Sequence, residues 1–488
     1  NNTSGTGTLA LTKAGTGTLT LSGTNIYTGN TLVSAGTLQF AKQVALYNNG
    51  AAAAWSRTNI NVNSGATMAF NIGGTGEFTK ADVITLLALS NGANGFQTGS
   101  ILGLDTTSGN FTYDSAIANP NSGANVLGLT KLGTNTLTLS STNTYTGATT
   151  ITQGTLQVGI SGALPNGTGK GNVVFSTAAN SAVLDINGID TTINGLSQAS
   201  ASTTNKVVNN ATGTAKTLTV GNADATSTFA GIIANNTSGT GTLALTKAGT
   251  GTLTLSAANT YTGATTISGG TLALGATGSI TSPNIIVGAS TTFDVSSVTG
   301  GYTLGAAQTL SGTGSVVGST VVAGTLSPGN SPGSMSVGSQ TWVNGGNYNW
   351  QILNATGSAG ADYDTIAMTG NLNLSNLTAG GFGINLWSLV SISPDSNGNA
   401  LHFDNTLNQS WTLLTASGAI TGFDAADFVI KTEAANGTGG FSNSLGGGAF
   451  TIGTSGNSLV LNFTAIPEPN VAALIGALGG ILLLRRRR

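Results

Sequence analysis

A short motif occurs three times in this chain, and it constrains the fold more than any other feature. Each copy begins Leu-Thr-Lys-x-Gly-x-x-Thr-Leu-Thr-Leu-Ser and continues through Asn-x-Tyr-Thr-Gly to Gly-Thr-Leu. The copies run from Leu11 to Leu38, from Leu129 to Leu156 and from Leu245 to Leu272. The segment from Asn1 to Ser22 is also identical to that from Asn235 to Ser256. Self-similarity of this kind indicates a stacked repeat architecture.

Within the motif, apolar and hydroxyl side chains alternate. In Thr252 to Ser256 the leucines occupy every second position and Thr or Ser the others. Successive side chains of a strand point to opposite faces, so this pattern predicts a half-buried β-strand. Gly263 and the Gly269-Gly270 pair punctuate the following segments, as turns do. One unit cannot bury its leucine face alone, whereas stacked units can.

The motif resembles the autotransporter-associated β-strand repeat of bacterial surface proteins. The matching residues of the third copy are Leu245 to Lys247, Gly249, Thr252 to Ser256, Asn259 to Gly263 and Gly270 to Leu272. The resemblance covers the three motif segments, and the chain between them is similar in style only. It implies an all-β fold, a right-handed parallel β-helix, displayed at or outside the cell surface.

The repeats suggest a division of the chain into modules. We expect β-helix modules at residues 1–125, 126–240 and 241–330, β-rich terminal rungs or a cap at 331–465, and a tail at 466–488. The first module holds an insertion with a helical segment near 79–90, for which Thr79 is the candidate N-cap. Four of the five Trp residues follow residue 340, which favours a terminal cap with a fuller hydrophobic core.

Composition narrows the partners. Charged residues make up 6% of the chain, against roughly 25% in an ordinary domain. Apolar residues make up 39%, and the Leu and Val among them recur periodically, which favours an ordered chain. Setting aside the four arginines at 485–488 leaves 10 of the 14 basic residues against 16 acidic ones. That balance gives no basic footprint for nucleic acid. The absence of cysteine does not fix the compartment.

The last residues form a second signal, made of three parts. A sorting motif, Pro467, Glu468 and Pro469, precedes the apolar run 471–484. The chain then ends in a basic tail that consists of Arg485, Arg486, Arg487 and Arg488. As a helix, the run of 14 residues spans about 21 Å, short of the ~30 Å hydrocarbon core. The arrangement resembles the PEP-CTERM protein-sorting signal: one short C-terminal membrane helix with a basic end.

The PEP-CTERM resemblance has implications for localisation. It implies recognition by an exosortase, a membrane transpeptidase-like enzyme, after transient anchoring in the inner membrane, and release to the cell surface or extracellular matrix. A plain single-span tail anchor is the alternative. No initiator Met or signal peptide stands at Asn1, so we expect an upstream part to have carried the export signal.

Isolated motifs of catalysis do not add up to a site. His402 is the one histidine, and a structural or surface position suits it better than catalysis. Gly-Asn-Ser331-Pro332-Gly resembles a nucleophile elbow, but Pro332 has no N–H for an oxyanion hole. The glycines before Lys170 match part of a phosphate loop, without its first Gly and the Ser/Thr that follows the Lys.

Two acidic pairs remain. Asp362 and Asp364 flank Tyr363 and are conceivable as calcium ligands or a glycosidase pair, although Asp in a Gly-rich turn is the simpler interpretation. Asp185 and Asp190 have the same two interpretations. We therefore predict no catalytic, cofactor-binding or metal-binding residues, and no cofactor.

The sequence thus predicts an exported, non-enzymatic bacterial surface or matrix protein with a structural or adhesive role. Its expected partners are an exosortase-type processing enzyme and, as a further possibility, exopolysaccharide or cell-surface glycans. The alternative is a β-helix protein that binds or degrades polysaccharide, since fold alone does not decide activity. A passenger with its own C-terminal translocator fits the short helix and arginines poorly.

Overall fold

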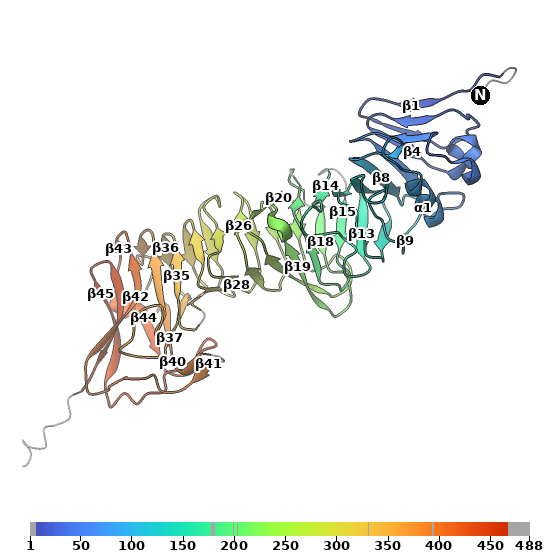
Figure 1. The fold of residues 1–488 in the computed structure, drawn as a ribbon. Coiled ribbons are helices and arrows are strands. Elements are labelled where there is room, and N and C mark those ends of the chain that lie inside the picture. Colours follow the sequence, from blue (N-terminus) through green and yellow to red (C-terminus); the bar gives the residue numbers. More distant parts are fainter. Residues whose placement is uncertain are drawn as a thin grey trace, which may run out of the picture. The chain divides into compact units, whose positions relative to one another are not determined.

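The structure is a computed structural model that describes residues 6–176, 181–198, 200–202, 204–329, 331–392 and 395–466. β-strands dominate it, and most of them pair in parallel (Figure 1). The chain forms two compact units. The first holds the described residues up to Ile285 together with Thr291–Thr299, and the second holds Ile286–Ser290 and the described residues from Gly300 onward.

In the first unit, the strands of successive rungs lie beside one another in sheets. One sheet has the order β1 (Leu11–Lys13), β3 (Thr31–Val33), β5 (Ile60–Val62), β7 (Gly95–Phe96). A second has the order β2 (Thr18–Leu21), β4 (Thr37–Phe40), β6 (Thr67–Asn71), β8 (Ser100–Asp105), β10 (Leu127–Leu132), β12 (Thr149–Ile151), β14 (Val173–Phe175), β17 (Leu196–Ser197). A third has the order β9 (Phe111–Tyr113), β11 (Thr136–Leu139), β13 (Gly154–Val158), β15 (Ala182–Asp185), β18 (Lys206–Val208), β21 (Ile232–Ile233).

Later rungs of the first unit continue this arrangement. They give the orders β16 (Thr191–Ile193), β19 (Ala215–Val220), β22 (Thr242–Lys247), β25 (Thr265–Ile267), and β20 (Ser227–Phe229), β23 (Thr252–Leu255), β26 (Thr271–Leu274), β29 (Thr292–Asp294). Strand β24 (Ala258–Asn259) pairs with β27 (Ser279–Ile280), and β28 (Asn284–Val287) follows in sequence. Single 3₁₀ turns lie at Gln43–Ala45, Asn48–Gly50, Ala52–Ala54 and Asn222–Asp224.

Strand register explains why the motif folds in this way. Leu129 of β10 pairs with Thr149 of β12, about twenty residues on, and Leu137 of β11 pairs with Leu156 of β13. Leu137 thus packs on Leu156 in the interior, and both side chains are fully buried. The predicted half-buried strands are confirmed, and the sheets are mainly parallel, as a solenoid-like fold requires.

The insertion contains the α-helix of the described residues. Helix α1 (Lys80–Ala88) begins after Thr79, whose hydroxyl accepts the Asp82 N–H (3.3 Å) while the Asp82 carboxylate accepts the Thr79 N–H (2.7 Å). These reciprocal bonds satisfy two donors that a helix start leaves free. Val83 and Leu86 are buried. The helix and N-cap predicted from the sequence are confirmed.

In the second unit, parallel rungs give way to antiparallel strands. One sheet has the order β31 (Thr309–Gly312), β34 (Thr325–Pro328), β37 (Asn347–Ile352), β40 (Phe382–Ile392), β41 (Asp395–Asn397), with β44 (Phe428–Lys431) also on β40. Another has the order β32 (Ser315–Val317), β35 (Ser334–Val337), β38 (Thr365–Met368), β42 (Gln409–Ala416), β46 (Ser458–Thr464), β45 (Ala449–Ser455). A third has the order β30 (Tyr302–Leu304), β33 (Thr320–Val322), β36 (Gln340–Trp342), β39 (Leu372–Asn373), β43 (Ile420–Thr421). A 3₁₀ turn lies at Ala425–Asp427. Strand β41 pairs antiparallel with β40, and β46 pairs antiparallel with both β42 and β45.

Aromatic side chains fill the interior of this second unit. Trp342 and Trp350 are fully buried, and Trp342 stacks on Phe382 with ring centroids 4.3 Å apart. Trp350 lies against Trp411, with ring centroids at 5.9 Å. Three of the Trp residues that follow residue 340 are thus buried, while the terminal cap and the module boundaries stay predictions.

The predicted sorting tail lies outside the described residues. These positions are the sorting motif Pro467, Glu468 and Pro469, the apolar run 471–484, and the basic tail Arg485, Arg486, Arg487 and Arg488. Within the residues that are described, no helix has the length and apolar character needed to cross a membrane. The short membrane helix and the basic tail that follows it therefore stay predictions.

Candidate functional site

The lysine of the repeat motif is a buried structural cation. Lys131 is fully buried, and its Nζ donates to the carbonyls of Leu132 (2.7 Å), Gly133 (2.8 Å) and Gln153 (3.0 Å). The Leu132 carbonyl lies at the end of β10 and the Gly133 carbonyl in the turn that follows, while the Gln153 carbonyl lies in the corresponding turn of the next rung, between β12 and β13. One ammonium therefore joins two successive turns.

The other two copies repeat this geometry. Lys247 donates to the carbonyls of Ala248, Gly249 and Gly269, at 2.7, 3.0 and 3.1 Å. Lys13 donates to the carbonyls of Ala14, Gly15 and Ala35, at 2.9, 2.7 and 3.2 Å. Burial lowers the pKa of Lys131 to about 7 against the opposing effect of the Asp105 carboxylate, and burial also lowers the pKa of Lys247.

The asparagine of Asn-x-Tyr-Thr-Gly joins three rungs. The Asn143 side chain accepts the Ile117 N–H (2.7 Å) from the preceding rung and donates to the Ala163 carbonyl (2.7 Å) of the following one. In the third copy, Asn259 accepts the Ile233 N–H (2.9 Å) in the same way. Buried amides that bond on both sides fix the stacking of the rungs.

The tyrosine of the motif is also internal. Tyr145 is fully buried, and its hydroxyl pairs with the Thr149 hydroxyl at 2.6 Å. Tyr27–Thr31 and Tyr261–Thr265 form the same pair, each at 2.7 Å. The Lys, Asn and Tyr of the motif thus form hydrogen bonds within the fold, and other positions of the repeat face outward.

Rows of threonine form the outer face of the repeats. Thr219, Thr246 and Thr266 are paired in register on β19, β22 and β25, and all three are half-buried. Thr138 on β11 bonds to Gln157 on β13 at 3.0 Å. These rows carry hydroxyl and amide groups that can form hydrogen bonds, and they are the candidate contact surface of the repeats.

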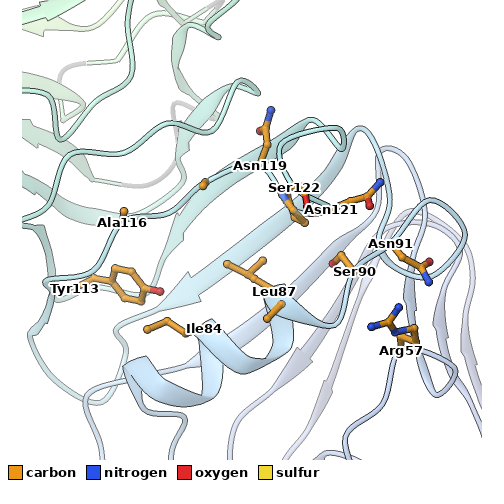
Figure 2. Close-up of a pocket in the computed structure, with 13 residues that line it drawn as sticks. Arg57, Ile84, Leu87, Ser90, Asn91, Tyr113, Ala116, Asn119, Asn121 and Ser122 are labelled. Carbon is orange, nitrogen blue, oxygen red and sulfur yellow. The ribbon is translucent and has the colours of Figure 1, made fainter.

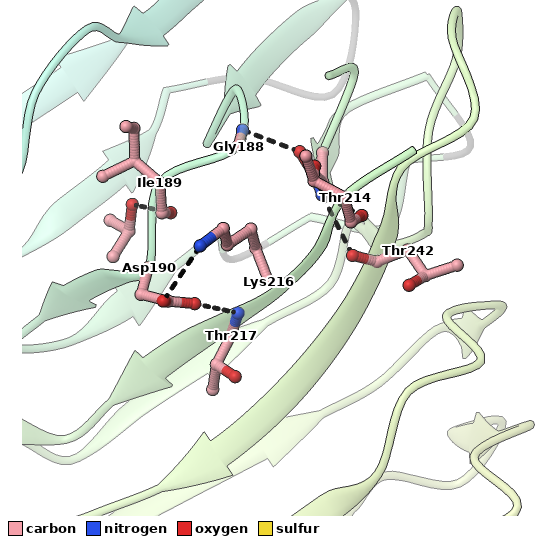
Figure 3. Close-up of polar contacts among 9 residues, drawn as sticks. Gly188, Ile189, Asp190, Thr214, Lys216, Thr217 and Thr242 are labelled. Atoms are coloured by element: carbon pink, nitrogen blue, oxygen red, sulfur yellow. Dashed lines mark hydrogen bonds and ion pairs between the residues drawn. The ribbon is translucent and has the colours of Figure 1, made fainter. Parts of the chain in front are cut away.

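The first acidic pair is built into the fold. Asp185 is buried and accepts the N–H groups of Asn187 (2.9 Å) and Asn210 (3.0 Å). Asp190 is exposed; it accepts the Thr217 N–H (2.8 Å) and pairs with Lys216 at 3.3 Å (Figure 3). The two carboxylates bind different backbone segments and do not converge on a common space.

The second acidic pair also divides. Asp364 is fully buried and accepts the N–H groups of Gly333 (2.7 Å) and Gln351 (2.9 Å). Burial raises the pKa of its carboxyl well above the usual range, against the opposing effect of these two hydrogen bonds. Asp362 accepts the Ser358 N–H (2.8 Å) instead. Within the described ranges, no group of three or more His, Asp or Glu side chains is placed to hold a metal ion.

The remaining single candidates lie apart. His402 is exposed, and its Nδ1 lies 2.9 Å from the Asn354 side-chain oxygen. The Ser331 hydroxyl is buried, with no hydrogen-bond partner among the residues that the structure places. Lys170 donates to the Thr144 carbonyl at 2.8 Å, which ties down a loop. The hydrogen bonds of these three side chains do not join any of them to another.

Sequence reasoning did not assign the motif lysines a role. A signal was present: the chain has few charges, yet a lysine recurs at one motif position among apolar and Thr residues at 13, 131 and 247. Buried lysine is rare unless it is bonded, so a lysine in a predicted core strand indicates a structural bond. The carbonyls that it binds depend on strand register, which the sequence does not display.

Comparison with known proteins identifies the same three segments. The sequence model of the passenger-associated-transport-repeat family matches residues 11–40, 129–158 and 245–274. Each match runs from the first strand of one rung to the end of a strand in the next rung, as from β10 to β13. The chain therefore carries three autotransporter-associated repeats, as its sequence predicted, and each repeat is a pair of stacked rungs.

A relative with a described role is also found. The chain is 36% identical over 149 residues to the protein "Adhesin BmaC autotransporter" of Brucella suis biovar 1 (strain 1330). The similarity covers 30% of this chain and 4% of the length of that relative.

Proposed function

We propose that this chain is an exported, non-enzymatic bacterial protein of the cell surface or extracellular matrix, with an adhesive or structural role. The observation that carries the proposal is the presence of three passenger-associated-transport repeats, each folded as two stacked rungs. The similarity to an autotransporter adhesin supports the adhesive side of the proposal.

The use of polar residues agrees with a scaffold. The motif lysine, asparagine and tyrosine bond between rungs, while threonine rows form the outer face. Such rows present hydroxyl and amide groups for hydrogen bonding without needing a reactive centre. Crossover connections between parallel strands are nearly always right-handed, so the finer proposal is a right-handed parallel β-helix.

The proposed export route uses the C-terminal tail. Pro467-Glu468-Pro469, the apolar run 471–484 and the four terminal arginines would direct the chain to an exosortase-type enzyme, after transient anchoring in the inner membrane. The arginines would stay on the cytoplasmic side, in line with the positive-inside rule. The body of the chain would then lie outside the inner membrane.

The test of this route is the mass of the C-terminus in native surface and matrix fractions. We expect a chain that ends near Pro467 to Asn470, without the peptide that carries Arg485 to Arg488. A Glu468→Gln variant should accumulate uncleaved in the membrane fraction, while Glu433→Gln, in the body of the chain, should be processed normally. An intact arginine tail on the wild-type chain in the membrane would replace sorting with a plain anchor.

A further inference from the structure

A pocket of about 490 Å³ lies beside helix α1 in the first unit, between the helix and the loop that follows strand β9 (Figure 2). Its volume falls within the range of about 300–1,000 Å³ that small-molecule sites occupy. Ile84 and Leu87 of α1 form one side, and Ala116 with Pro120 of the loop contributes to the other. Repeat packing does not account for this space, because the insertion, not a repeat, builds one side of it.

The pocket exists because β9 is an end strand of its sheet. Strand β9 pairs with β11 on one side, and on the other side helix α1 lies beside it, held by the Lys80–Asp114 ion pair at 2.6 Å. A helix does not follow the pleat of a strand, so the two elements leave a space between them. Tyr113, the last residue of β9, lines that space.

Tyr113 carries a polar group that the fold leaves unused. Its side chain is 1% exposed, and its hydroxyl has no hydrogen-bond partner among the residues described. Figure 2 shows this hydroxyl directed toward the helix side of the pocket, near Ile84. Burial, with a smaller contribution from the Asp114 carboxylate, raises the pKa of Tyr113 to about 12, so the phenol keeps its proton and remains a donor. A buried donor without a partner destabilises the fold, and a ligand that accepts its hydrogen bond removes that cost.

A cation lies at the opposite end of the pocket. Arg57 is exposed and is the one charged side chain among the lining residues that the structure describes. No ion pair joins it to a carboxylate in that part of the chain. The body of the chain is acidic, so an arginine that faces a pocket without a carboxylate partner favours an anionic ligand group, which its planar guanidinium binds at two points.

We propose that this pocket binds a carboxylated sugar unit of an acidic polysaccharide. The carboxylate of this unit pairs with Arg57, hydroxyls of this unit and of the adjoining sugar bond to the polar side chains of Asn121 and Ser122 and to Tyr113 at the other end, and the apolar ring faces lie on Ile84 and Leu87. The assignment rests on the proposed surface function, because it supplies the adhesive contact with a ligand class.

The test is calorimetric titration of the whole 488-residue chain, purified in mild detergent, with digalacturonate. The methyl ester of the same disaccharide is the neutral control. We expect the acid to bind and its ester to bind at least about tenfold more weakly, because the ester loses the charge-assisted bonds to Arg57.

Variants locate the binding. Arg57→Gln should weaken binding of the acid about tenfold or more, and Tyr113→Phe should weaken it several-fold while leaving thermal stability unchanged or higher. Lys216→Gln removes a surface cation that does not line the pocket and should bind as the wild type does. Because the Tyr113 hydroxyl bonds to nothing within the described fold, a purely structural role predicts no effect of Tyr113→Phe on binding.

Several outcomes would overturn the proposal. These are no binding of the acid, equal binding of acid and ester, or binding that survives Arg57→Gln. A glutamate-containing tripeptide that binds in place of the sugar would assign the pocket to protein recognition and would also overturn it. The titration uses purified protein, so its failure leaves export and cell attachment, which are measured separately, unaffected.

Discussion

Substitution of the buried motif lysine tests the account of the repeat most sharply. Lys131→Met keeps the length and apolar stem of the side chain and removes its donors. The Leu132 carbonyl also accepts the Thr106 N–H at 3.1 Å, whereas the carbonyls of Gly133 and Gln153 lose their bond to the ammonium. Each buried acceptor left unpaired costs about 1–3 kcal/mol. Relief from the desolvated cation offsets part of this cost, so we expect a net loss of about 2–4 kcal/mol.

The assay is hydrogen exchange measured by mass spectrometry at pH 6, where the ammonium is charged. In a repeat protein, destabilisation stays near the altered rungs, so amides of β10 to β13 should exchange faster while those of β22 to β26 in the third copy should not. Lys170→Met, a surface change at a lysine with one loop bond, should change local stability by less than about 0.5 kcal/mol. Unchanged or slower exchange in β10 to β13 would refute the structural role of Lys131.

Three further predictions follow from buried groups. Leu253→Ala should lower the free energy of unfolding by about 2–4 kcal/mol, because Leu253 is fully buried. Leu19→Ala changes the same position of an identical segment and should lower it by clearly less, because Leu19 is 37% exposed. Paired urea titrations of the two variants measure the difference. Tyr145→Phe should cost about 1 kcal/mol in thermal unfolding, because it loses the Thr149 bond, while the same change at Tyr113 should not destabilise; equal losses would contradict the assigned contacts. Because burial lowers the pKa of Lys131 to about 7, the unfolded chain binds one more proton than the folded chain from about pH 7 to 10, and the free energy of unfolding should rise with pH in that range. The part of this rise that is due to Lys131 should vanish in Lys131→Met. Urea midpoints of both proteins at pH 7 and pH 9 measure it.

Short sequence patterns predicted several of the strands and the helix. Alternation in Thr252 to Ser256 predicted a strand, and β23 lies there with Leu253 and Leu255 buried. Thr79 followed by an apolar periodic segment predicted a capped helix, and α1 has that cap. These features are short-range: side-chain period and helix capping depend on residues within a few positions of each other.

Features that depend on register were beyond the pattern. Lys131 reaches the Gln153 carbonyl only because β10 and β12 pair about twenty residues apart. The identical segments that contain Leu19 and Leu253 differ in burial, because β20 lies on β23 while β2 is an end strand among the described residues. The pocket beside Tyr113 likewise depends on where the insertion places α1.

The most direct test of the central claim is attachment of cells from which this chain has been deleted, measured on polysaccharide-coated surfaces and between cells. We expect reduced attachment at normal growth, with recovery when the wild-type chain is restored to the surface. Unchanged attachment in the deletion strain, with the chain shown to be surface-exposed in the parent by protease treatment of intact cells, would contradict an adhesive role.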